Sequence, residues 1–240
     1  EMAPFHREML RITKDTCIRT AVVMAFRSSA KSTIFSLSYP LWAILGEQQL
    51  KYIIIVSQTQ QKAQQLLGHI KRELENNKLL QNDLGPFQTE GNGPWSITSI
   101  YIPKYNAKIT AASIEQGIRS FRHNQYRPQL IICDDIEDQE SVKMRESRDK
   151  TFQQVTRDII PAGDTDTRLI MVGNLLHEDS TIMKLSEAVR EGRMDGVSLR
   201  YPLLDDEGKI AWLGKFPDME AVEAERKRIG NESAWQQEYL

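Results

Sequence analysis

The sequence predicts an α/β fold of three layers, with helices on both faces of a mainly parallel central sheet. Three observations support this prediction. Four short runs are apolar throughout, as strands buried on both faces are. Segments with helical periodicity lie between these runs. A short stretch without such order follows the last run, and it predicts a small C-terminal subdomain beside one large domain.

The four apolar runs are the predicted strands of the sheet. Each is rich in apolar residues and lacks the alternation of a strand that has one face in water. They span residues 20–25, 52–56, 130–133 and 169–172. Alternating segments at 95–102 and 107–112 predict a hairpin-like pair, and glycine and proline predict loops before it at 85–86 and 91–94. Cys133 lies in the third run, where we expect it to be packed.

Helical segments separate the predicted strands. Residues 59–75 carry one apolar stripe, made of Ala63, Leu66, Leu67, Ile70 and Leu74. Residues 33–45 carry a similar stripe that Pro40 disturbs, and residues 141–160 predict a charged helix that stops at Pro161. After Val172 the helical pattern weakens until residues 218–240, which predict one or two amphipathic helices.

Composition excludes several classes of protein. The 240 residues are 40% hydrophobic and 27% charged, which is typical of a globular domain, and no apolar run approaches the roughly 20 residues that cross a bilayer. The N-terminus lacks the apolar region of a signal peptide. Two cysteines are too few for a disulfide framework or a zinc site, which favours a reducing, cytoplasmic setting.

Net charge and the chain ends add two expectations. The net charge is −2, so any contact with nucleic acid must be local or shared among several copies of the chain. The chain begins without methionine and ends at Leu240 without a polar tail. We therefore expect it to be part of a longer protein.

The most informative segment follows the first predicted strand. It reads Ala25-Phe26-Arg27-Ser28-Ser29-Ala30-Lys31-Ser32-Thr33. This nearly matches the phosphate-binding P-loop G-x-x-x-x-G-K-[ST], with alanine at both glycine positions. We expect the main chain from Arg27 to Thr33 to cradle phosphates, with Lys31 on the β- and γ-phosphates. The Ser32 hydroxyl would bind Mg²⁺, and Arg27 would add a second cation. The alternative is an ordinary helix start that Ser28 or Ser29 caps.

Acidic residues follow the third predicted strand. Residues 134–138 read Asp134-Asp135-Ile136-Glu137-Asp138, at the end of a strand where a P-loop enzyme holds Mg²⁺. We expect Asp134 to hold the metal and Asp135 to orient and deprotonate the attacking water. Glu137 is a second candidate for the base. The alternative is a solvated acidic turn that caps the next helix.

Three further groups have a predicted role. Asn174 follows the fourth strand, from where its amide could sense the γ-phosphate. His177 and Asp179 predict a turn that faces solvent. The loop at 117–128 carries Arg119, Arg122 and Arg127, one of which could reach a neighbouring subunit's nucleotide or else lie over apolar neighbours. A further group predicts a solvated helix face rather than a DNA track: Lys143, Arg145, Arg148 and Lys150.

Taken in order, these motifs resemble the ATPase domain of the large terminase subunit, which packages DNA in tailed phages. The similarity covers nearly the whole chain. It includes residues 4–8, the loop from Phe26 to Thr33, Gly117-Ile118-Arg119, residues 126–128, Asp134-Asp135-Ile136-Glu137, Val172-Gly173-Asn174, residues 200–204 and Gln237-Glu238-Tyr239-Leu240. Arginine inside the phosphate loop is typical of terminases. The departures are Ala30 for glycine, Asp135 for glutamate, Asn174 for threonine or serine, and His6 near where a glutamine reads adenine.

The resemblance implies a RecA-like (ASCE) P-loop fold and a Mg²⁺-dependent ATPase that drives viral double-stranded DNA into a procapsid. It implies an ATPase core at residues 1–194 and a lid or linker subdomain at 195–240, which would lead to a nuclease domain outside these residues. It further implies Arg119 as the arginine supplied in trans and catalytic roles for Arg27, Asp135 and Asn174. The implied partners are DNA, the portal protein, the small terminase subunit and copies of the chain in a ring, a pentamer on the procapsid or a monomer in solution. The setting would be the cytoplasm of the infected bacterial host, with no membrane partner.

Two other functions fit the same residues. A helicase-like DNA translocase would use the same phosphate loop and acidic strand end, but it needs a second RecA-like domain. A non-catalytic nucleotide-binding or assembly module would explain the two alanines in the loop. An ATPase assay over a range of protein concentrations separates catalytic from non-catalytic candidates.

Overall fold

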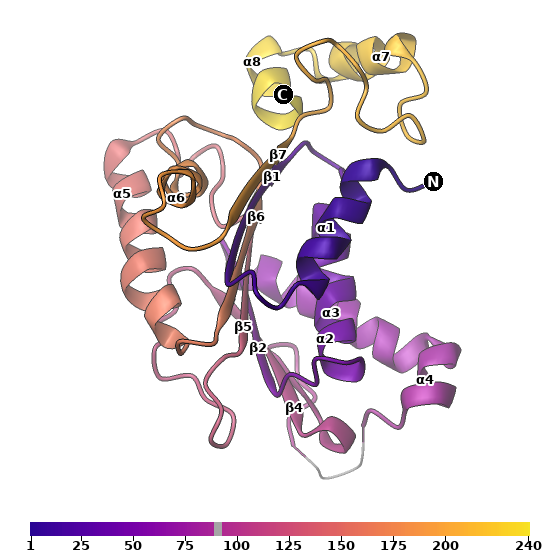
Figure 1. Ribbon diagram of the computed structural model, residues 1–240, viewed down its shortest axis with the longest axis vertical. Helices are drawn as coiled ribbons and strands as arrows, with labels where there is room; N and C mark the ends of the chain where they lie inside the picture. The colour runs from indigo at the N-terminus through magenta and orange to yellow at the C-terminus, as the bar shows by residue number, and fades with distance from the viewer. Residues whose placement is uncertain (89–92) are drawn as a thin grey trace.

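The computed structural model describes residues 1–88 and 93–240. They form a seven-stranded sheet with helices on both faces, as Figure 1 shows. The strand order is β3-β4-β2-β5-β6-β1-β7, and only β3 and β4 are antiparallel neighbours. The strands are β1 (Thr20–Ala25), β2 (Tyr52–Ser57), β3 (Ser99–Ile102), β4 (Ala107–Ser113), β5 (Leu130–Asp134), β6 (Arg168–Gly173) and β7 (Val197–Tyr201). The predicted three-layer α/β fold is confirmed.

The four apolar runs became the four central strands. Every residue of β1, β2, β5 and β6 is buried, because helices cover both faces of this part of the sheet. Cys133 is buried in β5 as expected. The hairpin-like pair is also confirmed, with a left-handed Asn106 (φ 46°) in its turn. Its first strand begins at Ser99 rather than at residue 95, and residues 91 and 92 of the predicted loop lie outside the described residues.

The helices form the two outer layers and a C-terminal pair beyond the end of the sheet. They are α1 (Pro4–Lys14), α2 (Tyr39–Leu45), α3 (Gln60–Asn76), α4 (Lys78–Leu84), α5 (Arg145–Gln154), α6 (Thr181–Arg190), α7 (Met219–Ile229) and α8 (Glu232–Tyr239). Two π-helical turns, Thr33–Ser38 and Val155–Ile159, precede α2 and follow α5. In Figure 1, α1, α2 and α3 lie on one side of the sheet and α5 and α6 on the other. None of the helices in the described ranges combines the length and apolarity that crossing a membrane requires.

The helix predictions were partly right. The stripe at 59–75 became α3, and residues 218–240 became α7 and α8. Residues 141–144 are a turn rather than the start of α5. The prediction of weak order after Val172 was wrong, because α6 forms there and buries Ile182 and Leu185 against the sheet.

The C-terminal part of the chain has two kinds of structure. β7 begins three residues after the proposed boundary at 194 and pairs with β1, so it belongs to the sheet. The sequence did not predict it, because β7 is an edge strand with half-exposed residues and no uniform apolar run. In Figure 1, α7 and α8 lie beyond the end of the sheet, next to the carboxyl ends of β1 and β7. The division into a core and a lid subdomain remains a prediction.

Candidate functional site

The loop after β1 has an unusual backbone although it contains no glycine. Two of its residues are left-handed, Ser28 (φ 62°) and Ala30 (φ 66°). Ala25 is the last residue of β1 and has no positive φ, so only the second glycine position of the motif demands unusual geometry. A left-handed conformation costs a non-glycine residue about 1–2 kcal/mol, which other contacts must offset. Hereafter residues 26–32 are called the phosphate loop.

The alternative of a serine-capped helix is not what the structure has. The helical stretch after the loop has no side-chain cap hydrogen bond at its start. Ser29 is fully buried, and its Oγ has no hydrogen-bond partner among the described residues. Within the same residues, the Ala30 N–H forms no hydrogen bond to the protein. It is therefore available to an anion.

Asp134 anchors the far side of the site. It ends β5, next to β6 and two strands from β1 in the sheet order. The Ser32 hydroxyl donates to its Oδ1 over 3.0 Å, and the Ser36 hydroxyl donates to its Oδ2 over 2.5 Å. Burial raises the pKa of Asp134 to about 6, and the neighbouring Asp135 carboxylate adds to the increase while the hydrogen bonds oppose it. A cation bound at Asp134 would offset the unfavourable burial of the carboxylate charge.

Asp135 and Glu137 have different environments. Asp135 is left-handed (φ 45°), which aspartate tolerates, and its side chain is 48% exposed. Its Oδ1 lies 4.0 Å from Lys31 Nζ. Both oxygens of Glu137 instead accept from the Thr181 N–H at the start of α6, each over 2.9 Å. Asp135 is thus the freer carboxylate, whereas Glu137 is held as a helix cap.

Lys31 and Asn174 meet across the site. Lys31 is buried, and its Nζ donates to Asn174 Oδ1 over 2.5 Å. The Asn174 amide donates in turn to Glu238 Oε2. β6 carries Asn174 to this point because its carboxyl end lies beside that of β1. The three predicted residues Lys31, Asp135 and Asn174 are therefore neighbours in space.

Glu238 is a member of the site that the sequence did not reveal. It lies on α8, its side chain is only 14% exposed, and its Oε1 accepts from Arg27 over 3.1 Å. Its main-chain carbonyl also accepts from the Arg27 N–H over 2.6 Å. One carboxylate thus occupies the Arg27 guanidinium and the Asn174 amide together. The motif Gln237-Glu238-Tyr239-Leu240 contributed to the resemblance, but nothing in it indicated this contact.

These side chains surround one cavity of about 570 Å³, called here the phosphate-loop cavity. Its lining consists of Arg27, Ser28, Lys31, Ser32, Lys62, Asp135, Glu137, Asp138, Gln139, Glu140, Asn174, Leu176 and Glu238. Asp134 and Ser32 offer the carboxylate and hydroxyl oxygens that Mg²⁺ prefers. Among residues 1–88 and 93–240, no three His, Cys, Asp or Glu side chains form a closed metal site. That donor set suits an ion that takes its other ligands from water and a substrate phosphate.

Other predicted residues lie outside this cavity. Thr33 is exposed at the start of the π-helical turn. Arg119 is exposed in the loop after β4 and does not line the cavity. His6 is buried and uses both ring nitrogens on main-chain groups, with Nδ1 accepting from the Ala3 N–H and Nε2 bonded to the Ser29 carbonyl. It therefore has no free ring nitrogen to hydrogen-bond to the adenine of a nucleotide.

The charged face of α5 differs from its prediction. Arg148 is buried rather than solvated, and it donates to Asp179 over 3.0 Å and to the Val142 carbonyl over 2.7 Å. Lys184 joins the same cluster through Asp179 and Asp149. The reason is that α6, which the sequence did not predict, packs against α5 and brings Asp179 to Arg148. The turn at His177 and Asp179 is confirmed, but Asp179 faces these cations.

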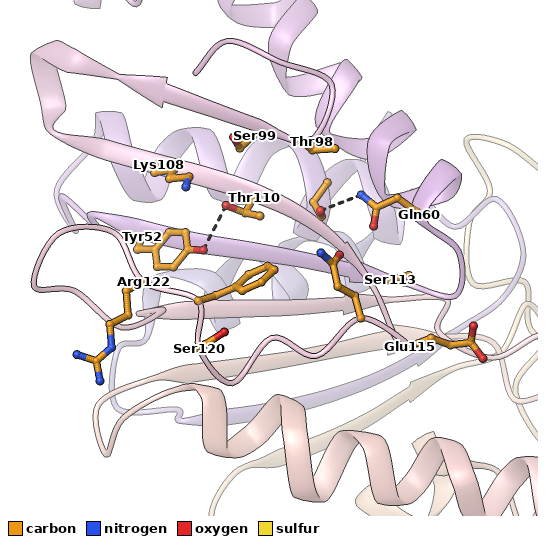
Figure 2. A pocket seen from close by; sticks show the side chains of 13 residues that line it. Tyr52, Gln60, Thr98, Ser99, Lys108, Thr110, Ser113, Glu115, Ser120 and Arg122 are labelled. Carbon is orange, nitrogen blue, oxygen red and sulfur yellow. Dashed lines mark hydrogen bonds between the residues drawn. The ribbon is translucent and has the colours of Figure 1, made fainter. Parts of the chain in front are cut away.

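A larger hollow lies elsewhere, between β4 and the loop at 115–122. This β4 hollow measures about 780 Å³. Figure 2 shows Thr110, Ser99 and Lys108 on the strands, with Ser120 and Arg122 on the loop that faces them. The Tyr52 hydroxyl lies 3.3 Å from Thr110 Oγ1, as the dashed line marks. The hollow contains none of the predicted phosphate or metal ligands, and Arg119 precedes the lining residue Ser120 in the sequence without lining the hollow itself.

Comparison with known proteins gives relatives by fold alone. No family model matches the chain, and no curated protein matches it in sequence. The large terminase of bacteriophage HK97 superposes with a TM-score of 0.66 and 13% identity over all of this chain, which spans about half (50%) of that terminase. A mutant ATPase domain of the Thermus phage P74-26 large terminase gives 0.59 and 12% identity over 96% of this chain and 91% of its own.

A third structure has a similar fold. The Saccharomyces cerevisiae protein dbp5, in a complex that holds ADP, gives a TM-score of 0.50 and 12% identity, and it covers 84% of this chain and 48% of its own. At such identities the similarity concerns the fold. The resemblance to terminase ATPase domains is thus confirmed at the level of architecture, and the three structures share this α/β fold.

Proposed function

We propose that this chain is the ATP-hydrolysing motor domain of a viral DNA-packaging machine. One observation carries the proposal: Lys31, Asp134 with Ser32, Asp135 and Asn174 converge at the carboxyl ends of β1, β5 and β6. Ligands bind at this edge of parallel sheets. The similarity in fold to two phage terminase ATPase structures over nearly the whole chain supports the choice of a packaging motor.

Each residue has a defined task in this proposal. The N–H groups of the phosphate loop and the Lys31 ammonium bind the phosphates and neutralise charge that develops on the γ-phosphate. Ser32 and Asp134 would hold Mg²⁺, which would offset the charge of the substrate phosphates. Asp135 accepts a proton from the attacking water, since it is the less constrained carboxylate. When its ion pair with Glu238 breaks, the Arg27 guanidinium binds the phosphate as a second cation.

Asn174 connects hydrolysis to movement. Its amide already bridges Lys31 in the core and Glu238 on α8. When the γ-phosphate binds, Lys31 exchanges the Asn174 amide for phosphate oxygens, and Arg27 exchanges the Glu238 carboxylate for them. When the γ-phosphate leaves, both contacts within the protein form again. The position of α8 therefore depends on nucleotide state. A lid subdomain that includes α7 and α8 would transmit this change to DNA.

The remaining parts of the proposal concern partners. The chain would act on double-stranded DNA with the portal protein and the small terminase subunit, in the cytoplasm of an infected bacterium. A ring of copies would bring the exposed Arg119 of one subunit to the phosphate-loop cavity of the next. The exposed position of Arg119, outside its own cavity, supports a role in trans.

Steady-state hydrolysis of Mg·ATP at a series of protein concentrations tests the proposal. We expect a rate per chain that rises with concentration or on templates that assemble a ring, and that disappears in Lys31→Ala. Hydrolysis absent even in assembled rings would favour a non-catalytic module. Strand separation without DNA packaging would favour the helicase-like alternative.

A further inference from the structure

The phosphate loop of this chain carries backbone strain that a glycine loop avoids. Ser28 and Ala30 are both left-handed, and neither is glycine, asparagine or aspartate. Ser29 lies between them and is fully buried. A loop with two unfavourable residues persists only where its surroundings hold it. The contacts of the intervening peptide show what holds it here.

His6 is the buried contact to this peptide. It comes from the first turn of α1 and bonds through Nε2 to the Ser29 carbonyl at 2.9 Å. Its Nδ1 accepts the Ala3 N–H at 2.9 Å, so the proton is on Nε2, which donates to Ser29. Burial lowers the pKa of His6, which favours this neutral form. The ring also packs edge-on against Trp212, with centroids 4.5 Å apart.

This hydrogen bond fixes the orientation of a functional N–H. The carbonyl of Ser29 and the N–H of Ala30 belong to one planar trans peptide, so they point in opposite directions. His6 holds the carbonyl on its own side, and the Ala30 N–H forms no hydrogen bond within the described residues. An N–H held in this way is suited to an anion in a cradle of main-chain donors.

We propose that His6 is a positioning residue of the phosphate loop, which holds the Ser29 carbonyl and so lets alanine occupy a position where such loops otherwise use glycine. The inference rests on the proposed function only for the ligand, a nucleoside triphosphate. It assigns His6 to the support of the loop rather than to recognition of the nucleobase, because both ring nitrogens are already used. Selectivity between adenine and guanine therefore does not come from His6.

A second side chain supports the same loop more weakly. Lys215 Nζ donates to the Ser28 carbonyl over 3.0 Å and lies over the rings of Trp212 and Phe216, 5.6 and 5.5 Å from their centroids. Lys215 and Ser28 are both exposed, so water competes for this bond. We expect Lys215→Met to change nucleotide affinity by less than about twofold, against a larger effect of His6.

The test is a cycle that removes the bond and the strain separately. His6→Phe keeps a ring beside Phe5 and Trp212 but loses the donor to Ser29 and the acceptor of the Ala3 N–H. Ala30→Gly removes the left-handed cost at one of the two positions. We expect His6→Phe to weaken binding of non-hydrolysable ATP and GTP analogues equally, by about tenfold, since it leaves a buried carbonyl unpaired. In the Ala30→Gly background the loss should fall below twofold. Ile12→Val, on the same helix, is the control for general destabilisation and should leave affinity unchanged.

Hydrogen exchange of the nucleotide-free chain gives a second readout. His6→Phe should accelerate amide exchange in the peptide that covers residues 26–33, and Ala30→Gly should reduce that acceleration. An equal effect in both backgrounds, or none, overturns the inference. A change in the ratio of ATP to GTP affinity overturns it too, because His6 would then read the base. If the native chain binds no nucleotide, the proposed function fails, while the exchange cycle still decides the role of His6.

Discussion

The phosphate-loop cavity and the β4 hollow differ in size and in chemistry. The hollow is larger, about 780 Å³ against about 570 Å³. Its walls are mainly hydroxyl and amide side chains on an open part of the sheet, and its Lys108 lies over the Tyr52 ring at 5.9 Å. The smaller cavity brings ammonium, guanidinium, carboxylate and amide groups into direct contact from three strand ends and α8.

Convergence of charged groups, rather than volume, therefore distinguishes the cavity that we propose as the reactive site. The carboxyl ends of β1, β5 and β6 meet at one edge, so residues distant in sequence share one cavity. The β4 hollow is lined by residues of β2, β3, β4, the first residue of α3 and loops beside them. Four paired substitutions test the comparison, in order of decreasing expected effect.

Lys31→Ala against Lys108→Ala is the largest contrast. Loss of the Lys31 ammonium removes the main cation at the phosphates, so hydrolysis should fall to the assay background, a loss of roughly 10³-fold or more. Lys108→Ala should stay within about twofold of the native rate. Phosphate release at saturating Mg·ATP measures both, and circular dichroism checks folding. Wild-type-like hydrolysis in Lys31→Ala would remove the phosphate loop from the mechanism.

Arg119→Ala against Arg122→Ala tests the arginine supplied in trans. Both side chains belong to the loop after β4. Arg119→Ala should abolish the rate gained at high protein concentration, by about 10³-fold if the arginine completes the neighbour's site. Arg122→Ala should keep that gain. The measurement is the rate per chain against concentration, and the reverse result would assign the role to Arg122.

Asp135→Asn against Glu137→Gln identifies the general base that accepts a proton from the attacking water. Asp135→Asn should retain ATP binding but lower turnover by about 10²-fold or more, because the group that accepts the proton is lost. Glu137→Gln should retain turnover and lower the free energy of unfolding by about 1 kcal/mol, because a charged cap at α6 is lost. Single-turnover kinetics and urea unfolding measure the two effects. Persistent hydrolysis in Asp135→Asn would point to Glu137.

Glu238→Gln against Glu232→Gln is the smallest contrast. Glu238 occupies Arg27 and Asn174, so its neutral amide should leave both groups freer for phosphate and strengthen ATP binding by about three- to tenfold. Glu232 lies on the same helix but pairs with Arg226 away from the cavity, so its substitution should have no effect. Equilibrium binding of a fluorescent ATP analogue compares them. Weaker binding in Glu238→Gln would mean that Glu238 organises the loop instead of competing with phosphate.

Local sequence patterns predicted the central strands and the loops that follow them. The central strands are buried on both faces, so their runs are apolar throughout and easily found. The phosphate loop follows β1, and Asp134 ends β5. The sequence therefore predicts, without tertiary information, that Lys31, Ser32 and Asp134 lie at strand ends. The edge strand β7 escaped because half-exposed residues give no such run.

The sequence by itself determined the sheet's core strands and the types of side chain at their ends, because uniformly apolar runs and the loop motif can be recognised in consecutive residues. Only the tertiary structure decided which distant groups meet there. The contact between His6 and Ser29 spans 23 residues, Arg148 and Asp179 are 31 apart, and Asn174 and Glu238 are 64 apart. A single polar residue has no periodicity that reveals its partner, since the partner depends on where the helices dock against the sheet.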